Sequence, residues 1–398
     1  MRIVHTLGFP LDFNGNLTRV LGEAIHTAKL GLDVDLIVSS KVPAGNLRKA
    51  VYSGVNVYLI NGLVPWREIG WRANNLIPLF TETLKILRNK PNVLLHIAAP
   101  TPVTKPLSIS ELGRRLKKPI IVDLHDPWSA NPFSCKLPFL LQTQIMRRVI
   151  NTADAIVVAH TALLRLVQKI NKNKFVDLIP NGVDTELFKP KPRNTLVAQH
   201  VGIGEDDFVV AFSGHIMEHK GLDVLVRSAK LVHQKHDDVK FLILGDGPAR
   251  KQIEALVHEL NVAKIFIFTG FVPQETLVEY LSLANVCVAP YKPVSWFRVS
   301  LPETPLKVVE YMALGKPVIM SRISDDNVLT RSKGGILIAP DEVSELALSI
   351  IDLIRDEKLQ KTMGEKGRKY VEEHLSWTRI SKRLLEIYQF LSTKTQQK

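Results

Sequence analysis

Two carboxylates flank a predicted helix start in residues 300–319, the stretch of this chain best suited to bind a ligand. Pro305 presets the backbone for a first helical turn, and a Gly-Lys-Pro run ends that helix. The unpaired amides and the positive dipole end of the helix, together with Lys307, favour a diphosphate. Glu303 before the helix and Glu310 inside it are negatively charged and are not needed to balance the charge of the phosphates. Both can accept hydrogen bonds from hydroxyls, so the segment predicts a site for a sugar attached to a phosphate.

An ordinary amphipathic helix with a solvated Glu310 is the alternative interpretation of the same stretch. The neighbours of this glutamate are apolar: Val308, Val309, Met312 and Ala313. These apolar neighbours make a solvent-exposed helix face at Glu310 implausible. A buried carboxylate needs hydrogen-bond partners, which a ligand could supply.

The composition indicates a soluble globular protein of two domains. A chain of 398 residues exceeds the usual size of one core, and 45% of its residues are hydrophobic and 23% charged. Residues 1–7 are predicted to form a strand rather than a signal peptide, and no apolar run in the sequence is long enough to span a membrane. Cys135 and Cys287 are far apart, which excludes a disulfide framework or a zinc site and fits a reducing cytoplasm.

The positive charge is concentrated in the first half of the chain. Of the net charge of +13, residues 1–180 carry +12 and residues 181–398 carry +1. A basic half can attract an anionic membrane surface, an acidic substrate or nucleic acid. Nucleic acid is the least favoured partner, because no stacking platform accompanies the basic residues.

Short apolar runs alternate with helical stretches along the whole chain. In the first half they are 3–7, 34–38, 55–60, 93–97, 120–124, 155–158 and 175–179. In the second half they are 208–213, 239–244, 265–268, 286–289, 318–320 and 335–338. This alternation predicts two doubly wound, Rossmann-like domains with parallel sheets, and ligands of this architecture bind at the carboxyl ends of the strands.

The turn composition of residues 180–184 predicts a hinge between the domains. We expect residues 1–180 to form the first domain and residues 181–375 the second. Residues 376–392 are expected to form a helix that crosses back to the first domain.

Lys220 lies in a segment that follows a predicted strand and opens a helix. A lysine in a first helical turn opposes the helix dipole unless an anion is nearby, and a phosphate would supply one. Neutralisation by Glu218 or Asp223 is the competing interpretation.

Near the N-terminus, Gly15 permits close approach of backbone amides to phosphate, although Asn-Gly is also a common turn.

His125 and Asp126 follow a strand of the first domain, beside an aromatic residue. His125 could hydrogen-bond a substrate hydroxyl, and Asp126 could orient its ring. A structural histidine and a capping aspartate are the alternative.

Five motifs occur along the chain in a fixed order: Pro-Asn-Gly-Val-Asp at 180–184, Gly214 with Lys220, Leu-Gly-Asp-Gly-Pro at 244–248, Gly-Phe-Val-Pro at 270–273, and the segment 303–319. In these motifs and their order the chain resembles the GT-B glycosyltransferases of family 4 over essentially its whole length. The resemblance implies a retaining transferase that takes a hexose-type sugar from a UDP- or GDP-sugar. The second domain would hold the donor and the first the acceptor.

The resemblance also implies roles for individual residues. Lys220 matches a diphosphate-binding lysine, and Glu310 matches a glutamate that binds the ribose. Glu303 lies near the glutamate that contacts the donor sugar, and His125 matches a histidine close to the reacting carbon, so these two are the catalytic candidates. The expected donor-binding residues are Gly15, Asn16, Gly214, His215, Lys220, Phe271, Arg298, Pro305, Leu306, Lys307 and Glu310.

Three positions depart from the family pattern. His215 stands where the family usually has arginine, and Arg298 is expected to compensate for the missing charge. Six residues separate Glu303 from Glu310 where the family has seven. Asn16 replaces the second glycine of the amino-terminal phosphate loop.

The sugar transfer that the resemblance implies needs few acidic side chains as catalysts. Departure of the diphosphate is the demanding step, and fixed cations and amide dipoles stabilise its charge. In a front-face retaining mechanism the leaving phosphate itself accepts the proton of the acceptor. No metal-binding cluster stands out in the sequence, and we expect no metal or other cofactor.

The acceptor is expected to be a glycan or lipid-linked precursor at the inner face of the cell membrane. Residues 65–80 and 132–141, followed by Arg147 and Arg148, mix aromatic, aliphatic and basic side chains in the basic half. Such mixtures suit peripheral contact with an anionic bilayer, although they also suit core helices with solvated basic faces. A nucleotide-sugar binding subunit without turnover and a nucleotide-sugar epimerase are the alternative functions.

Overall fold

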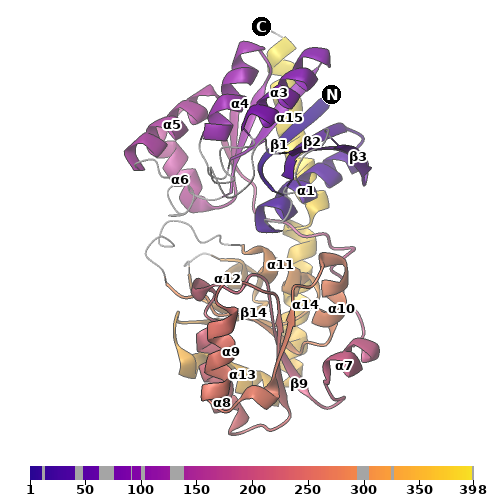
Figure 1. Cartoon of the computed structure of the whole chain (residues 1–398), viewed down its shortest axis with the longest axis vertical. Helices are drawn as coiled ribbons and strands as arrows, with labels where there is room; N and C mark the ends of the chain where they lie inside the picture. The colour runs from indigo at the N-terminus through magenta and orange to yellow at the C-terminus, as the bar shows by residue number, and fades with distance from the viewer. Residues whose placement is uncertain are drawn as a thin grey trace. The chain divides into compact units, whose positions relative to one another are not determined.

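The computed structural model describes residues 1–10, 14–40, 48–61, 76–90, 92–99, 104–125, 139–293, 304–323 and 327–396. The chain divides into two compact units (Figure 1). Unit 1 comprises Met1–Gly182 and Trp377–Lys398, and unit 2 comprises Val183–Ser376. The first change of unit falls inside residues 180–184, the segment whose turn composition predicts a hinge.

Unit 1 is built on an eight-stranded sheet with the order β3-β4-β2-β1-β5-β6-β7-β8. The strands are β1 (Arg2–Pro10), β2 (Asp33–Ser40), β3 (Arg48–Tyr52), β4 (Val55–Asn61), β5 (Val93–Ala98), β6 (Ile120–Leu124), β7 (Ala155–Val158) and β8 (Val176–Leu178). All neighbouring strands are parallel except β3 and β4. The direction of strand order reverses between β1 and β5, which is the position where such sheets bind ligands.

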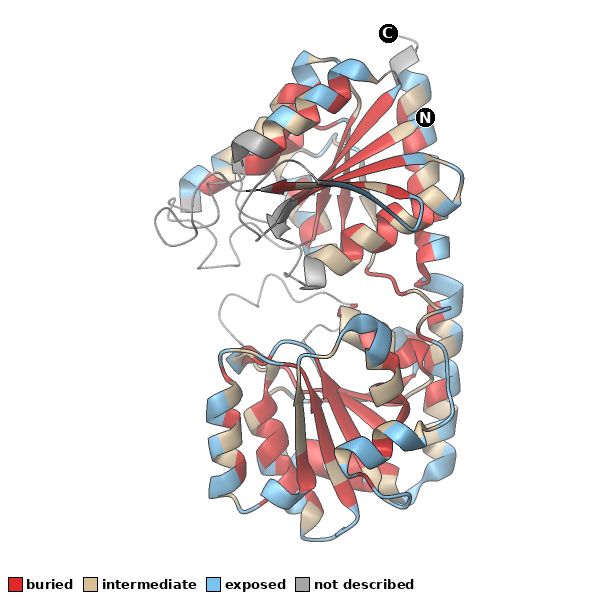
Figure 2. Ribbon diagram, turned by 45° about the vertical axis from the view of Figure 1, so that its right-hand side comes forward, coloured by how far each residue is buried: buried red, intermediate tan, exposed pale blue. Residues whose placement is uncertain are grey.

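Helices cover both faces of this sheet. They are α1 (Asn14–Lys29), α3 (Leu76–Asn89), α4 (Thr104–Arg115), α5 (Phe139–Thr152), α6 (Thr161–Ile170) and α15 (Trp377–Gln396). Apolar residues of α3 to α6 form one core with the sheet, and those of α1 and α15 pack on its other face. Because both faces are covered, β5, β6 and β7 are buried along their whole length (Figure 2).

Helix α15 belongs to unit 1 although it ends the chain. Leu384 and Tyr388 pack against Ile3 of the first strand. Trp377, at the start of the helix, lies so close to Gly22 of α1 that a Cβ atom there would be 2.2 Å from the indole ring. A glycine at position 22 is therefore required for this packing.

Unit 2 is built on a six-stranded parallel sheet with the order β11-β10-β9-β12-β13-β14. The strands are β9 (Phe208–Ser213), β10 (Val239–Leu244), β11 (Phe266–Gly270), β12 (Val286–Ala289), β13 (Val318–Ser321) and β14 (Gly335–Ile338). The strand order reverses between β9 and β12. The alternation of apolar runs and helices thus correctly predicts two parallel α/β units.

The helices of unit 2 also form two layers. They are α7 (Thr195–Val201), α8 (Leu222–His233), α9 (Arg250–Glu259), α10 (Gln274–Ser282), α11 (Leu306–Ala313), α12 (Val328–Ser332), α13 (Val343–Arg355) and α14 (Glu357–His374). Residues of α8, α9 and α13 form a core with one face of the sheet, and those of α10, α11, α12 and α14 pack on the other. None of the helices within the described ranges is long and apolar enough to cross a bilayer.

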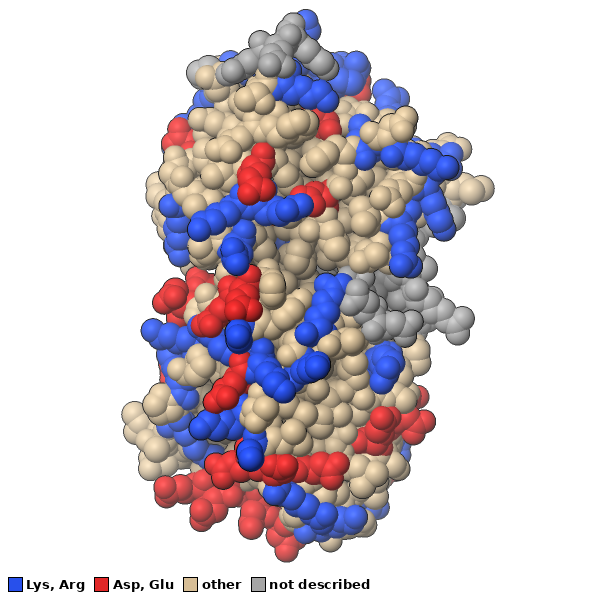
Figure 3. Space-filling model, turned by 180° about the vertical axis from the view of Figure 1, so that it is seen from behind, with Lys and Arg blue, Asp and Glu red and all other residues tan. Residues whose placement is uncertain are grey.

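The surface reflects the uneven charge of the sequence. On the face drawn in Figure 3, unit 1 carries mainly Lys and Arg, whereas on unit 2 Lys and Arg are mixed with many Asp and Glu.

Candidate functional site

The end of β9 is fixed to helix α11. The backbone amide of Ser213, the last residue of β9, donates to the hydroxyl of Tyr311 at 2.6 Å. Gly214 follows with a φ of +117°, and a Cβ atom there would lie 3.0 Å from Nζ of Lys307. The glycine therefore allows both the turn and the close approach of the lysine. Gly245, after β10, lies against the same turn, so the two glycine turns pack backbone to backbone.

Lys307 lies in the first turn of α11 with a buried ammonium group. Its Nζ is 3.7 Å from the centre of the Phe212 ring and has no hydrogen-bond partner among the described residues. Burial, followed by repulsion from Lys220, lowers its pKa well below the usual value, although Glu310 opposes this shift. A buried lysine amine without a partner costs stability, so this position is a candidate binding site for an anion, which would favour the charged form of the amine.

Lys220 supplies a second positive charge near Lys307. It ends the 3-10 turn η1 (Glu218–Lys220), and Gly221 separates it from α8, so it lies before that helix rather than in its first turn. Its Nζ is 5.0 Å from the centre of the Tyr291 ring. Asp223, a possible neutralising partner, forms its ion pair with Lys292 at 2.8 Å instead.

His215 and His219 lie in the electric field of these lysines. Burial, followed by repulsion from Lys220, lowers the pKa of both, and that of His219 falls to about 3. Both rings are therefore neutral at pH 7. They offer hydrogen bonds but no fixed charge, so any positive charge at this site comes from Lys220 and Lys307.

Glu310 lies one turn after Lys307 on α11. Burial raises its pKa to about 7, against the attraction of Lys307. The carboxyl group is half-buried, as the apolar neighbours predict, and near neutral pH it is present in both protonated and ionised forms.

The raised pKa of Glu310 predicts a pH dependence of stability. The protonated carboxyl contributes stability that is complete below its usual pKa of 4.5 and is lost as pH rises through about 7. Glu310→Gln should flatten this decline, which amounts to roughly 3 kcal/mol for a shift of this size. Urea unfolding of both proteins between pH 4.5 and pH 8 measures the difference. Parallel profiles would show that the carboxyl is hydrated and the prediction wrong.

The structure places the other predicted donor-binding residues as follows. Pro305 is the N-cap of α11 and Leu306 its first helical residue, so the helix begins one residue after the proline expected in its first turn. Phe271 is 64% exposed after Gly270. Gly15 and Asn16 belong to the first turn of α1 rather than to a loop before it, and their side chains lie outside the described residues. Arg298 and Glu303 also lie outside the described residues.

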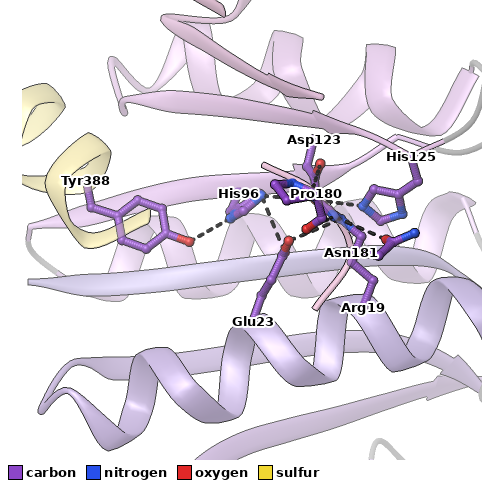
Figure 4. A network of polar contacts seen from close by, with 8 residues as sticks. All are labelled: Arg19, Glu23, His96, Asp123, His125, Pro180, Asn181 and Tyr388. Atoms are coloured by element: carbon purple, nitrogen blue, oxygen red, sulfur yellow. Dashed lines mark hydrogen bonds and ion pairs between the residues drawn. The ribbon is translucent and has the colours of Figure 1, made fainter. Parts of the chain in front are cut away.

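His125 lies at the carboxyl end of β6 in unit 1. Its Nε2 is 2.6 Å from Oδ2 of Asp123, two residues earlier on the strand (Figure 4). Arg19 of α1 binds the same carboxylate through Nε and Nη2, at 3.1 Å each. All three side chains are buried. The observed partner of the His125 ring is therefore Asp123; Asp126, proposed from the sequence, lies outside the described residues.

Arg19 and Asp123 belong to a larger buried network. Arg19 also donates to the carbonyl of Pro180 at 3.0 Å and approaches Oε1 of Glu23 to 3.2 Å. His96 of β5 pairs through Nδ1 with the hydroxyl of Tyr388 at 2.8 Å, which joins α15 to the sheet (Figure 4).

The described residues include a group in unit 1 with metal-ligand chemistry. One atom each of His5, Glu23 and His96 lies within 4.8 Å of the others, and all three residues are buried. The guanidinium of Arg19 already lies beside Glu23, so a cation there would meet a fixed positive charge. The expectation of a metal-independent reaction remains a proposal.

Sequence analysis missed Arg19 and Asp123. Asp123 interrupts the apolar run 120–124, and a carboxylate inside a buried strand is itself a signal. Its partner could not be named from the sequence, because Arg19 lies 104 residues away.

Two family models match the chain. The model of glycosyl transferases group 1 matches residues 195–370, and that of Glycosyltransferase Family 4 matches residues 14–187.

The curated relatives are distant. The GDP-mannose-dependent alpha-(1-6)-phosphatidylinositol monomannoside mannosyltransferase of Mycolicibacterium smegmatis is 26% identical over 246 residues, 61% of this chain and 64% of that protein. The chain thus spans less than two thirds of the length of this relative. The N-acetyl-alpha-D-glucosaminyl L-malate synthase of Bacillus anthracis is 25% identical over 300 residues, 74% of this chain and 73% of that protein.

Solved structures match the whole chain. Sucrose-phosphate synthase from Thermosynechococcus elongatus has a TM-score of 0.76 at 21% identity, covering 99% of this chain and 100% of that one. HepE from Anabaena, in complex with UDP and glucose, has a TM-score of 0.72 at 16% identity, covering 97% and 99%. At these identities the likeness concerns the fold.

Proposed function

We propose that this chain, whose two halves match the models of glycosyl transferases group 1 and Glycosyltransferase Family 4 and which has the two-domain GT-B fold, is a sugar-transferring enzyme. It moves a hexose-type sugar from a nucleoside diphosphate sugar to an acceptor with retention of configuration. The observation that carries the proposal is the pair Lys220 and Lys307 beside the glycine turn after β9. One of these cations is buried without a partner, at the position where the strand order reverses. A diphosphate would supply the counter-charge that Lys307 lacks.

The remaining roles are those that the family resemblance implies. The ionised form of Glu310 accepts hydrogen bonds from the ribose hydroxyls of the donor. His125 of unit 1 hydrogen-bonds a hydroxyl of the substrate. The bond from the sugar carbon to the diphosphate breaks, a bond from that carbon to the acceptor oxygen forms, and the leaving phosphate takes the acceptor proton. Lys220 and Lys307 stabilise the charge that develops on the leaving group, so no metal is needed.

A screen of nucleotides tests the donor site. We expect one of GDP, UDP or ADP, with its sugar conjugates, to raise the melting temperature of the wild type selectively. GDP-mannose is the first candidate, because a relative carries it in its name. Lys220→Ala and Glu310→Ala should both lose this stabilisation. If no nucleotide stabilises the wild type, the isolated protein has no donor site of this kind.

The proposed acceptor is lipid-linked, and the proposed location is cytoplasmic, peripheral on the inner membrane face. Leu140 and Leu141 are exposed on α5, in the same helix as the exposed Arg147 and Arg148. Most of the stretches 65–80 and 132–141 lies outside the described residues. A relative whose name includes phosphatidylinositol supports a lipid acceptor.

Vesicle flotation tests this location. At low salt we expect the wild type to float with anionic vesicles and not with neutral ones. The double variant Leu140→Ser, Leu141→Ser should lose most of the binding, because its apolar anchor is gone while the basic residues remain. Arg165→Ser, a change on another helix of unit 1, serves as the control. Failure of the wild type to float would reject membrane docking.

A further inference from the structure

The two ring nitrogens of His125 have unlike surroundings. Nε2 lies 2.6 Å from Asp123, whereas Nδ1 is buried and has no hydrogen-bond partner among the described residues. The ring follows β6 at the carboxyl edge of the sheet, where folds of this kind bind ligands (Figure 4). Nδ1 is therefore the atom of this ring that remains for a ligand.

The protonation of the ring follows from the geometry around Asp123. Arg19 donates to both carboxylate oxygens, from Nη2 to Oδ1 and from Nε to Oδ2. A carboxylate whose two oxygens both accept from a guanidinium is ionised and can only accept from His125 as well. Nε2 must then carry a hydrogen, and in the neutral ring Nδ1 keeps a free lone pair.

The neighbouring residues Glu23 and His96 do not change the assignment of the hydrogen to Nε2 of His125. Burial and repulsion from Asp123 raise the pKa of Glu23 well above its usual range, so Glu23 keeps its proton. Burial opposes ionisation of Asp123, but Arg19 and then His125 hold its pKa well below the usual range. Nε2 of His96 is 3.8 Å from Asp123, too far to compete for the same oxygen. The two carboxyl groups thus have opposite protonation states.

We propose that Asp123, clamped by Arg19, is a positioning residue that holds His125 as the Nε2–H tautomer, so that Nδ1 accepts a hydrogen bond from a sugar hydroxyl of the substrate. The hydroxyl rests on the proposed function, whereas the tautomer does not. A ring protonated at Nδ1 would present a donor to the ligand and leave two acceptors facing each other at Nε2 and Asp123.

Nitrogen NMR of the full-length protein tests the tautomer directly. With ¹⁵N in the histidine rings, His125→Gln identifies the signals of His125. We expect the wild type at pH 7 to carry hydrogen on Nε2 alone. In Asp123→Asn the amide can donate or accept, so the single tautomer should be lost. Turnover should then fall by roughly 10²-fold or more, with KM changed by less than about threefold.

Asp35→Asn is the matched control. Asp35 is also a buried aspartate of this sheet, ion-paired with Arg2 and Lys90, and lies outside the network of His125. Its replacement should reduce stability without changing the His125 signals or the turnover number.

The outcomes test separately the positioning role of Asp123 and the proposed function. A wild-type ring protonated at Nδ1, or an unchanged tautomer in Asp123→Asn, would overturn the positioning role. If Asp123→Asn does not fold, the wild-type spectrum still decides the tautomer. A fixed Nε2–H ring in a protein that neither binds nor cleaves nucleotide sugars would support the tautomer and reject the proposed function.

Discussion

Lys307→Met is expected to make the protein more stable and at the same time to remove most of its affinity for nucleoside diphosphates. The buried ammonium has no hydrogen-bond partner among the described residues, so methionine relieves a desolvation cost while keeping the packing on Phe212. We expect a gain of about 1 to 3 kcal/mol in the free energy of unfolding. Loss of a charge-assisted bond to phosphate should weaken binding by roughly 30-fold or more. Calorimetric unfolding and titration measure the two effects.

Lys316→Met provides the matched control, with the opposite expected result. Lys316 is also a largely buried lysine of unit 2, but its Nζ donates to the carbonyls of Ser282 and Ala284 at 3.0 and 2.6 Å. Methionine at this position leaves those carbonyls unpaired, so stability should fall while nucleotide affinity stays unchanged. If Lys307→Met lowers stability as Lys316→Met does, the ammonium of Lys307 is a structural group and not a ligand-binding one.

Arg19→Met is expected to cause the largest loss of stability among the changes considered. Arg19 is only 1% exposed and is paired with the fully buried Asp123 and Glu23. Removing the guanidinium leaves Asp123 without its neutralising charge, which costs about 3 to 5 kcal/mol for a buried pair. Denaturant unfolding of the full-length protein measures this loss.

Arg2→Met is the comparison for Arg19→Met. Arg2 is partly exposed, and its buried partner Asp35 keeps Lys90 and Asn56 as further partners. The expected loss is about 1 kcal/mol or less. Equal losses in the two variants would show that Asp123 adapts to the missing guanidinium, for example by taking up a proton.

The local pattern of apolar residues along the chain was sufficient to predict most of the fold. Apolar runs such as 120–124 and 155–158 coincide with β6 and β7, because strands covered on both faces have to be apolar throughout. The helix at 306–313 was predicted from Pro305 and the glycine that follows it. Strand β3 was missed, since an edge strand with Arg48 and Lys49 has no continuous apolar run, whereas its partner β4 coincides with the apolar run 55–60.

The site could be predicted only where its parts lie close together along the chain. Lys307 and Glu310 share one helix, and their spacing by three residues places them on one side of it. The contact of His125 with Asp123 was not predicted, although an alternating strand turns these two residues to the same side. The link from Arg19 depends on tertiary packing and has no local signature.

A ¹H NMR time course tests the central claim most directly. The wild type is mixed with the nucleotide sugar that stabilises it most and with an extract of anionic membrane lipids. We predict release of the nucleoside diphosphate together with a new glycosidic signal of the same anomeric configuration as the donor. An intact nucleotide carrying an epimerised sugar would show an epimerase, and a bound donor that is never cleaved would show a binding subunit. Either result, or a product of inverted configuration, would contradict retaining sugar transfer.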